Sequence, residues 1–110
     1  MSSYVLIESR DPFEYGDSRY MYNLAGDLAG KGNDVTLFLI QNGVFTARPG
    51  VKNNPLTGVV TGSAVKVVAD EFSLRERGIS QSALVDGVGV SDVDGLVDLL
   101  VQDGAKIVWH

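Results

Sequence analysis

Two adjacent carboxylates, Asp70 and Glu71, are the side chains of this sequence best placed for chemistry. They follow an apolar run that ends at Ala69 and precede a short helical pattern. Neighbouring carboxylates at the end of a strand suit an acid–base or ligand-binding pair. They also suit the N-cap and first turn of the next helix, where negative charge is favourable. Acidic caps are common, so we favour the capping role.

Three other positions offer weaker signals. Arg10 lies in the triplet Arg10-Asp11-Pro12, which suits either an anion site at a sheet edge or a solvated turn. Asn42 and Gly43 form a turn pair that borders the expected ligand cleft. Arg48 is the cation of that nearby loop and would meet an acidic ligand, although simple solvent exposure is the preferred interpretation.

The composition excludes several kinds of site. With no cysteine, the chain has no disulfide, no thiolate metal site and no thiol redox chemistry. The single histidine, His110, is the last residue and gives no basis for a zinc site or a Ser-His-Asp triad. The formal charge is −5 with no Lys/Arg cluster, which argues against a nucleic-acid partner. We expect neither a metal nor a cofactor.

The chain also lacks signals for membranes and export. No apolar run approaches the length of a membrane span, so we expect no membrane partner. The first residues lack the basic and apolar regions of a signal peptide. The expectation is a cytoplasmic protein.

Apolar runs predict the strands that must position these side chains. Residues 4–8, 35–40, 64–69 and 105–109 are short, apolar and rich in β-branched residues. The run 35–40 shows almost no polar alternation, which is typical of a parallel strand covered on both faces.

Helical patterns separate these runs. Residues 17–31, 71–77 and 91–103 have helical spacing, and Ser91 with Asp94 resembles a capping box. Alternating strands and helices predict one α/β domain over residues 1–110. We expect a three-layer, mainly parallel sheet of four or five strands with helices on both faces.

The irregular stretch 41–63 is long for a loop in a compact domain, so it is functional or contains a short helix at 57–63. Its apolar residues have no place in the helix and strand stripes. We therefore predict that they form an interface between subunits of a homo-oligomer, the alternative being that they complete the monomer's own core. These residues are Val44, Phe45, Leu56, Val59 and Val60.

The fold locates a site without naming its chemistry. In an open parallel sheet, ligands bind beyond the carboxyl ends of the strands. Residues 9–16, 41–50 and 70–71 follow successive predicted strands, so we expect them to line one concavity.

The same segments carry a family resemblance. Residues 65–79, residues 41–44 and residues 84–91, followed by an amphipathic helix and a last apolar strand, resemble DsrE/DsrF-like proteins in order and spacing. The resemblance covers essentially the whole chain and implies the flavodoxin-like arrangement of that family. It also implies assembly, because DsrE-like proteins form dimers, trimers and hexamers.

Sulfur-carrying members of that family have a cysteine at the end of the third strand, which accepts a persulfide in a relay. Counting back from Arg77-Gly78, that position is Asp70 here. The resemblance therefore implies the fold and the site but not sulfur transfer. The leading hypothesis is a non-catalytic or accessory DsrE-like trimer or hexamer, for which a sulfur-relay protein is the candidate partner. The alternatives are a small-molecule enzyme using Asp70 and Glu71, and a structural subunit that pairs with a cysteine-bearing paralogue.

Overall fold

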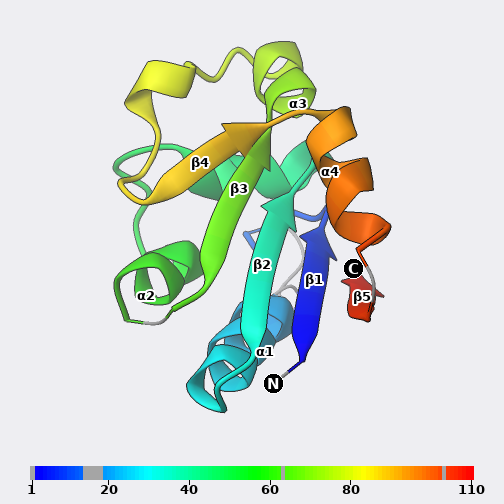
Figure 1. Cartoon of the computed structure of the whole chain (residues 1–110). Helices are drawn as coiled ribbons and strands as arrows, with labels where there is room; N and C mark the ends of the chain where they lie inside the picture. The colour runs from blue at the N-terminus through cyan, green and yellow to red at the C-terminus, as the bar shows by residue number, and fades with distance from the viewer. Residues whose placement is uncertain (1, 14–18, 63, 103) are drawn as a thin grey trace.

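In the part of the chain that the structure describes, five parallel strands form one sheet (Figure 1). The computed structural model describes residues 2–13, 19–62, 64–102 and 104–110. The strand order is β4-β3-β2-β1-β5, and every neighbouring pair is parallel. This confirms the predicted fold class. The strands are β1 (Ser3–Glu8), β2 (Asp34–Leu39), β3 (Lys66–Asp70), β4 (Val88–Ser91) and β5 (Ala105–Trp109).

Helices connect the strands as the pattern predicts, and the described residues also form two short 3₁₀ helices that it did not predict. The helices are α1 (Arg19–Gly30), η2 (Gln41–Ala47), α2 (Pro55–Gly62), α3 (Glu71–Glu76), η3 (Gln81–Ala83) and α4 (Val93–Leu100), of which η2 and η3 are 3₁₀ helices. The stretch 41–63 thus contains two helices. Proline at the first position of α2 suits a helix start, and Asn54 Oδ1 accepts the backbone N–H of Leu56 there. None of the described helices is long and apolar enough to cross a membrane.

The cap predicted for α4 is wrong by one residue. Asp92 is the N-cap, and its Oδ1 accepts the backbone N–H of Gly95 at 2.9 Å. Ser91 belongs to β4, a strand that the sequence pattern does not resolve as a separate element. A carboxylate at this position replaces the hydroxyl cap that we expected, and it satisfies the N–H group of Gly95 instead of that of Asp94.

The two faces of the sheet are covered unequally. On one face, α1 and α2 bury Met21, Tyr22 and Leu56 against alternate residues of β1, β2 and β3. On the opposite face, the described helix that covers the sheet is α4, through Leu96 and its neighbours (Figure 1). This second cluster contains Val5, Ile7, Phe38, Val68 and Leu96, with Ile40, Leu99 and Leu100 packed against it.

The residues predicted for a subunit interface lie largely inside the monomer. Val44, Leu56 and Val59 are buried in the cluster beneath α1, and Val60 packs against it. Phe45 is half-buried on η2. Since η2 and α2 fold back onto the sheet and α1, these side chains complete the chain's own core. The burial of Val44, Leu56 and Val59 contradicts the interface that we assigned to them.

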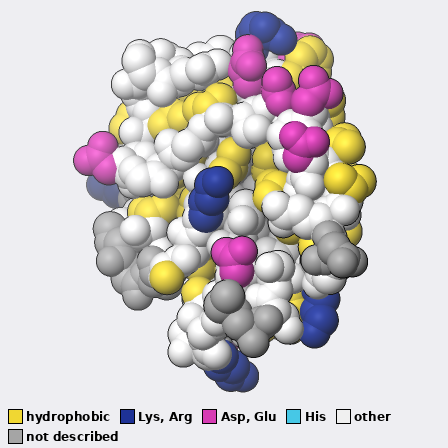
Figure 2. Space-filling model, viewed as in Figure 1, with side chains coloured by type: hydrophobic (Ala, Val, Ile, Leu, Met, Phe, Trp, Pro, Cys, Tyr) yellow, Lys and Arg dark blue, Asp and Glu magenta, His cyan; other side chains and the backbone are white. Residues whose placement is uncertain are grey.

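Exposed apolar residues gather instead on α4 and β5. Val93, Val97 and Val101 recur every four residues along the outer side of α4, the last just beyond its end, and all three are exposed. Ile107 and Trp109 of the edge strand β5 are exposed as well. Figure 2 shows hydrophobic side chains over the region of α4. The weakly covered face of the sheet therefore continues into an apolar surface.

Candidate functional site

A cavity of about 740 Å³ opens at the carboxyl ends of β2 and β3. It lies on the α4 face of the sheet, between η2, α3, α4 and the end of β5. Its polar lining consists of Gln41, Asn42, Asp70, Ser73, Glu76 and Arg77. Its apolar lining consists of Ile40, Phe45, Phe72, Val93, Leu96 and Trp109. A cavity of this size, with apolar walls and a few converging polar groups, suits a small organic ligand.

Asp70 is both the N-cap of α3 and part of the cavity lining. Its Oδ2 accepts the backbone N–H of Ser73 at 2.9 Å and the Ser73 hydroxyl at 2.7 Å. The side chain is buried, with 8% of the residue exposed. The capping role favoured from the sequence is thus present, and the same carboxylate faces the cavity.

Hydrogen bonds join η2 to α3 beneath the cavity. The Gln41 backbone N–H donates to Ser73 Oγ at 2.8 Å. Arg77 Nε donates to Asn42 Oδ1 at 3.0 Å, and its Nη1 donates to the Ser73 carbonyl at 3.2 Å. Gln41 has φ of 50°, a conformation that non-glycine residues adopt rarely. The chain therefore fixes the polar side of the cavity through contacts between segments about 30 residues apart.

Gly43 is required by the close approach of η2 to β1. A Cβ at this position would fall on the carbonyl oxygen of Glu8, which is backbone and cannot swing aside. The Gly43 N–H donates to the Ile40 carbonyl at 2.9 Å and starts the 3₁₀ turn. Glycine at this position lets Asn42 reach the cavity, so its role is steric.

Guanidinium groups already stack on two of the aromatic rings around the cavity. Arg48 lies 4.9 Å from the centroid of the Phe45 ring, and Arg77 lies 5.9 Å from it. Arg75 lies 5.7 Å from the Phe72 centroid. Among the described residues, Trp109 has no such cation, and 61% of the residue is exposed. Its indole is the open aromatic surface of the site.

Four residues predicted for the site are not in the cavity lining: Arg10, Gly43, Arg48 and Glu71. Arg10 is exposed, and its backbone N–H donates to Glu8. Arg48 is exposed on the outer side of Phe45. The carboxylate of Glu71 lies 3.8 Å from the guanidinium of Arg75, and Glu71 is not part of the lining. Of the predicted segment 9–16, residues 14–16 lie outside the described part of the chain.

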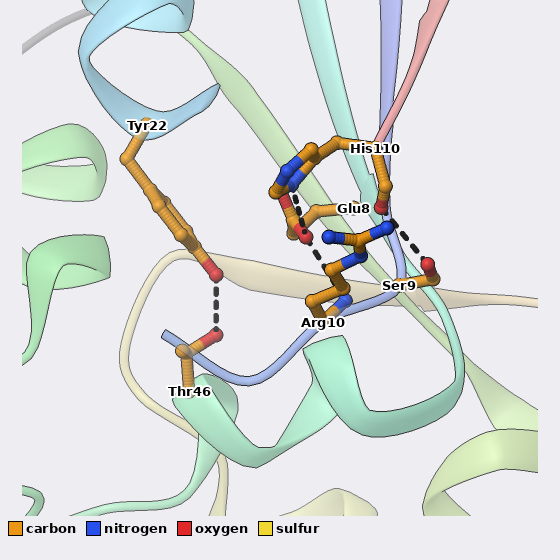
Figure 3. A network of polar contacts seen from close by, with 6 residues as sticks. All are labelled: Glu8, Ser9, Arg10, Tyr22, Thr46 and His110. Carbon is orange, nitrogen blue, oxygen red and sulfur yellow. Dashed lines mark hydrogen bonds and ion pairs between the residues drawn. The ribbon is translucent and has the colours of Figure 1, made fainter. Parts of the chain in front are cut away.

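A second polar cluster, which sequence reasoning missed, lies on the opposite face of the sheet. Glu8 at the end of β1 is fully buried, and its Oε2 lies 2.9 Å from His110 Nδ1 (Figure 3). Its Oε1 accepts the backbone N–H of Arg10 at 2.9 Å. Burial raises the pKa of Glu8, although the bonds from Arg10 and His110 oppose that rise. The sequence held one signal for this cluster: Glu8 is an acidic residue at the end of the otherwise apolar run 4–8.

The same cluster includes buried hydroxyls. The Tyr22 hydroxyl bonds to Thr46 Oγ1 at 3.3 Å, and Thr46 Oγ1 donates to the Gly43 carbonyl at 3.0 Å. Burial raises the pKa of Tyr22, and the charge of Glu8 adds to this rise. The Ser9 N–H and hydroxyl both donate to the carbonyl oxygen of His110. These bonds tie the end of β5 to β1, which is a structural task.

Metal binding finds little support in the described ranges. There, no three His, Asp or Glu side chains converge in a way that could hold a metal ion. The chemistry open to the cavity is hydrogen bonding through Asp70 and the amide side chains, together with contacts to aromatic rings.

Comparisons with known proteins bear on the family and the fold. The family model described as the DsrE/DsrF-like family matches residues 2–109. The YchN protein from E. coli has a similar crystal structure, with a TM-score of 0.82, 24% identity and full coverage of both chains. A protein of unknown function from Methanobacterium thermoautotrophicum, MTH1491, is similar with a TM-score of 0.75, 20% identity and full coverage of both chains. A search of curated proteins found no match.

Proposed function

Because this chain belongs to the DsrE/DsrF-like family but has no cysteine, we propose that it is an accessory, non-catalytic member that binds a ligand and carries no persulfide. The observation that supports this most is the state of Asp70. By the family resemblance, Asp70 stands where sulfur-carrying members have their cysteine. Here the carboxylate caps α3 and lines a cavity of about 740 Å³. The site is retained as a binding pocket, while its sulfur chemistry is lost.

The loss of sulfur chemistry follows from the atoms involved. Persulfide transfer requires a thiolate that attacks the sulfane sulfur and then holds it covalently. A carboxylate forms no stable bond of this kind, and one oxygen of Asp70 is already occupied by two hydrogen bonds from Ser73. A link to sulfur metabolism would therefore operate through binding of a partner or metabolite.

The competing enzyme hypothesis has less support. It requires Asp70 and Glu71 to act together on one substrate. Glu71 is absent from the cavity lining and pairs weakly with Arg75 on the surface. One carboxylate with an open oxygen suits ligand recognition better than a two-carboxylate mechanism does.

Assembly is the second part of the proposal. The exposed stripe of Val93, Val97 and Val101 on α4 continues to Ile107 and Trp109 on β5. A small domain gains stability by covering such a surface with another copy of itself. We propose a homo-oligomer that uses this α4–β5 surface, with a trimer or hexamer favoured by the family resemblance. An association only with a cysteine-bearing paralogue would favour the structural-subunit hypothesis instead.

Mass spectrometry after treatment with a persulfide donor tests the sulfur proposal. We expect the mass of the protein to stay unchanged. Asp70→Cys should gain sulfur, and Ser82→Cys, an exposed position on η3, serves as the matched control for mere thiol accessibility. A stable sulfur adduct on the unaltered chain would refute the proposal. Preferential labelling of the Asp70→Cys variant over the control would indicate that the site still directs sulfur to this position.

A further inference from the structure

The chemistry of the Asp70 cavity narrows the class of its ligand. Hydrogen bonds join the polar lining residues to one another: Gln41 and Asp70 to Ser73, and Asn42 to Arg77. The other lining residues are apolar and aromatic, and they include Phe72 and Trp109. A ligand that fills this space therefore needs a polar group and an apolar body.

One oxygen of this polar lining lacks a hydrogen-bond donor. Asp70 Oδ2 accepts both bonds from Ser73, and Oδ1 accepts none from any residue that the structure describes. A carboxylate oxygen that borders the cavity and accepts no bond from the described protein can accept hydrogen bonds from a ligand in place of water. The ligand group that best completes Asp70 is one that donates hydrogen bonds.

The charges around the cavity favour a cation over an anion. The lining contains two carboxylates, Asp70 and Glu76, and one guanidinium, Arg77. Two donor groups of Arg77 are already committed to Asn42 Oδ1 and the Ser73 carbonyl. The lining thus has a formal charge of −1, in a chain whose own net charge is −5. Within the described lining, an anionic ligand would find no cationic donor group except Arg77, whose Nε and Nη1 are already bonded.

The aromatic wall fits the same class of ligand. The aromatic body of a ligand can pack against the face of a tryptophan whose ring no protein cation covers. Guanidinium groups already occupy the neighbourhoods of Phe45 and Phe72, at 4.9–5.9 Å from the ring centroids. Trp109 is the remaining aromatic residue of the lining and is free of such a cation within the described chain.

We propose that the Asp70 cavity binds a small organic cation, a primary ammonium on an aromatic body, with the ammonium at Asp70 Oδ1 and the body between Trp109 and Phe72. This inference rests on the proposed ligand-binding function and specifies the ligand class of the same site. It involves no covalent step.

Trp109 gives a direct readout, because it is the sole tryptophan of the chain and lines the cavity. Three probes of one shape but different charge should be titrated at neutral pH while the Trp109 emission is recorded. These are benzylammonium, benzyl alcohol and benzoate. We expect benzylammonium to bind most tightly and to shift or quench the emission at saturation, with benzyl alcohol weaker and benzoate weakest.

Asp70→Asn separates charge from structure. Asparagine caps helices about as well as aspartate, so α3 should persist while the negative charge is lost. We expect the affinity for benzylammonium to fall about ten- to a hundredfold, as for a lost charge-assisted hydrogen bond, with little change for benzyl alcohol. Asp86→Asn is the matched control, since Asp86 is an exposed carboxylate outside the lining.

A second variant keeps the test valid if Asp70→Asn folds poorly. Trp109→Leu alters an exposed side chain, and binding to it can be followed by calorimetry. It should weaken benzylammonium and benzyl alcohol alike, because both use the aromatic wall. Tighter binding of benzoate, no binding of benzylammonium, or an equal loss in the Asp86→Asn control would overturn the inference. Tighter benzoate binding would leave the proposed ligand-binding role intact, and the sulfur experiment is independent of all three outcomes.

Discussion

The two faces of the sheet differ in how far the chain completes them. Beneath α1 and α2, the apolar side chains are buried, and the polar groups at the strand ends bond to one another, as Glu8 and His110 do. Beneath α4, the same edge of the sheet has an open cavity around Asp70 and an exposed apolar surface. The first face is finished by the chain itself. The second leaves room for a ligand and for another subunit, which is where we place function.

Truncation of an apolar side chain to alanine should lower the free energy of unfolding more on the α1 face of the sheet than on the outer side of α4. Leu56 is fully buried beneath α1, so Leu56→Ala should lower the free energy of unfolding by about 2–5 kcal/mol. Val97 on α4 is 48% exposed, so Val97→Ala should change the stability of the monomer by less than about 0.5 kcal/mol. Urea unfolding of both variants, at a concentration where any oligomer is dissociated, measures the difference. Similar losses would mean that the two faces are equally complete.

The α4–β5 surface should control assembly without controlling the fold. Val97→Asp combined with Val101→Asp places two charges on this surface and should reduce the oligomer to a monomer. Light scattering at micromolar concentration gives the mass, and circular dichroism checks that the helix content is unchanged. Lys52→Asp, an exposed change on a loop away from α4, is the control. A monomeric mass for the unaltered protein would remove the basis of this part of the proposal.

The contact between η2 and β1 joins the two faces and should be intolerant of added volume. Gly43→Ala places a methyl group against the Glu8 carbonyl, so we expect a loss of about 1–3 kcal/mol. Gly26→Ala is the matched control, because its Cβ meets nothing within 4 Å inside α1. That change should stabilise the protein by about 0.5–1 kcal/mol. Thermal unfolding of both variants measures these changes as shifts of the melting temperature. An unchanged melting temperature for Gly43→Ala would show that η2 can move away from β1.

The Glu8–His110 pair should give the closed face a dependence on pH. Because burial raises the pKa of Glu8, the folded protein holds this proton more tightly than the unfolded chain does. The contribution of Glu8 to stability is complete below its ordinary pKa and is lost as the pH rises through the raised value. Glu8→Gln lacks this titration. Relative to that variant, the unaltered protein should be more stable near pH 4 than near pH 7, as measured by unfolding at each pH. A constant difference between the two proteins would show that Glu8 is not buried as described.

Much of the fold could be read from local patterns. The unbroken apolar run at 35–40 is β2, which lies between two parallel neighbours. Asp70 caps α3, and Gly78 follows its end with φ of 66°. These features depend on residues close together in the chain, so their signals are local. The cap at Asp92 was missed because Ser91 offered an equally plausible pattern one residue earlier.

The burial of the stretch 41–63 was beyond local patterns. Val44, Leu56 and Val59 carry no periodicity that separates an interface from a core, and only their packing under α1 decided it. In α4, the sequence pattern likewise could not predict which apolar residues stay exposed. Its sequence is apolar on two sides, and packing on the sheet selected Leu96 for burial while leaving Val93 exposed.

The sequence by itself determined the parallel α/β fold, the edge where a site would lie and the absence of a sulfur-accepting thiol. Each depends on residue types or on neighbours within a few positions. The tertiary structure alone decided which side chains meet at that edge. Glu8 and His110 are 102 positions apart, and Asn42 and Arg77 are 35 apart. Such contacts depend on how the strands are ordered in the sheet, and no local pattern carries that information.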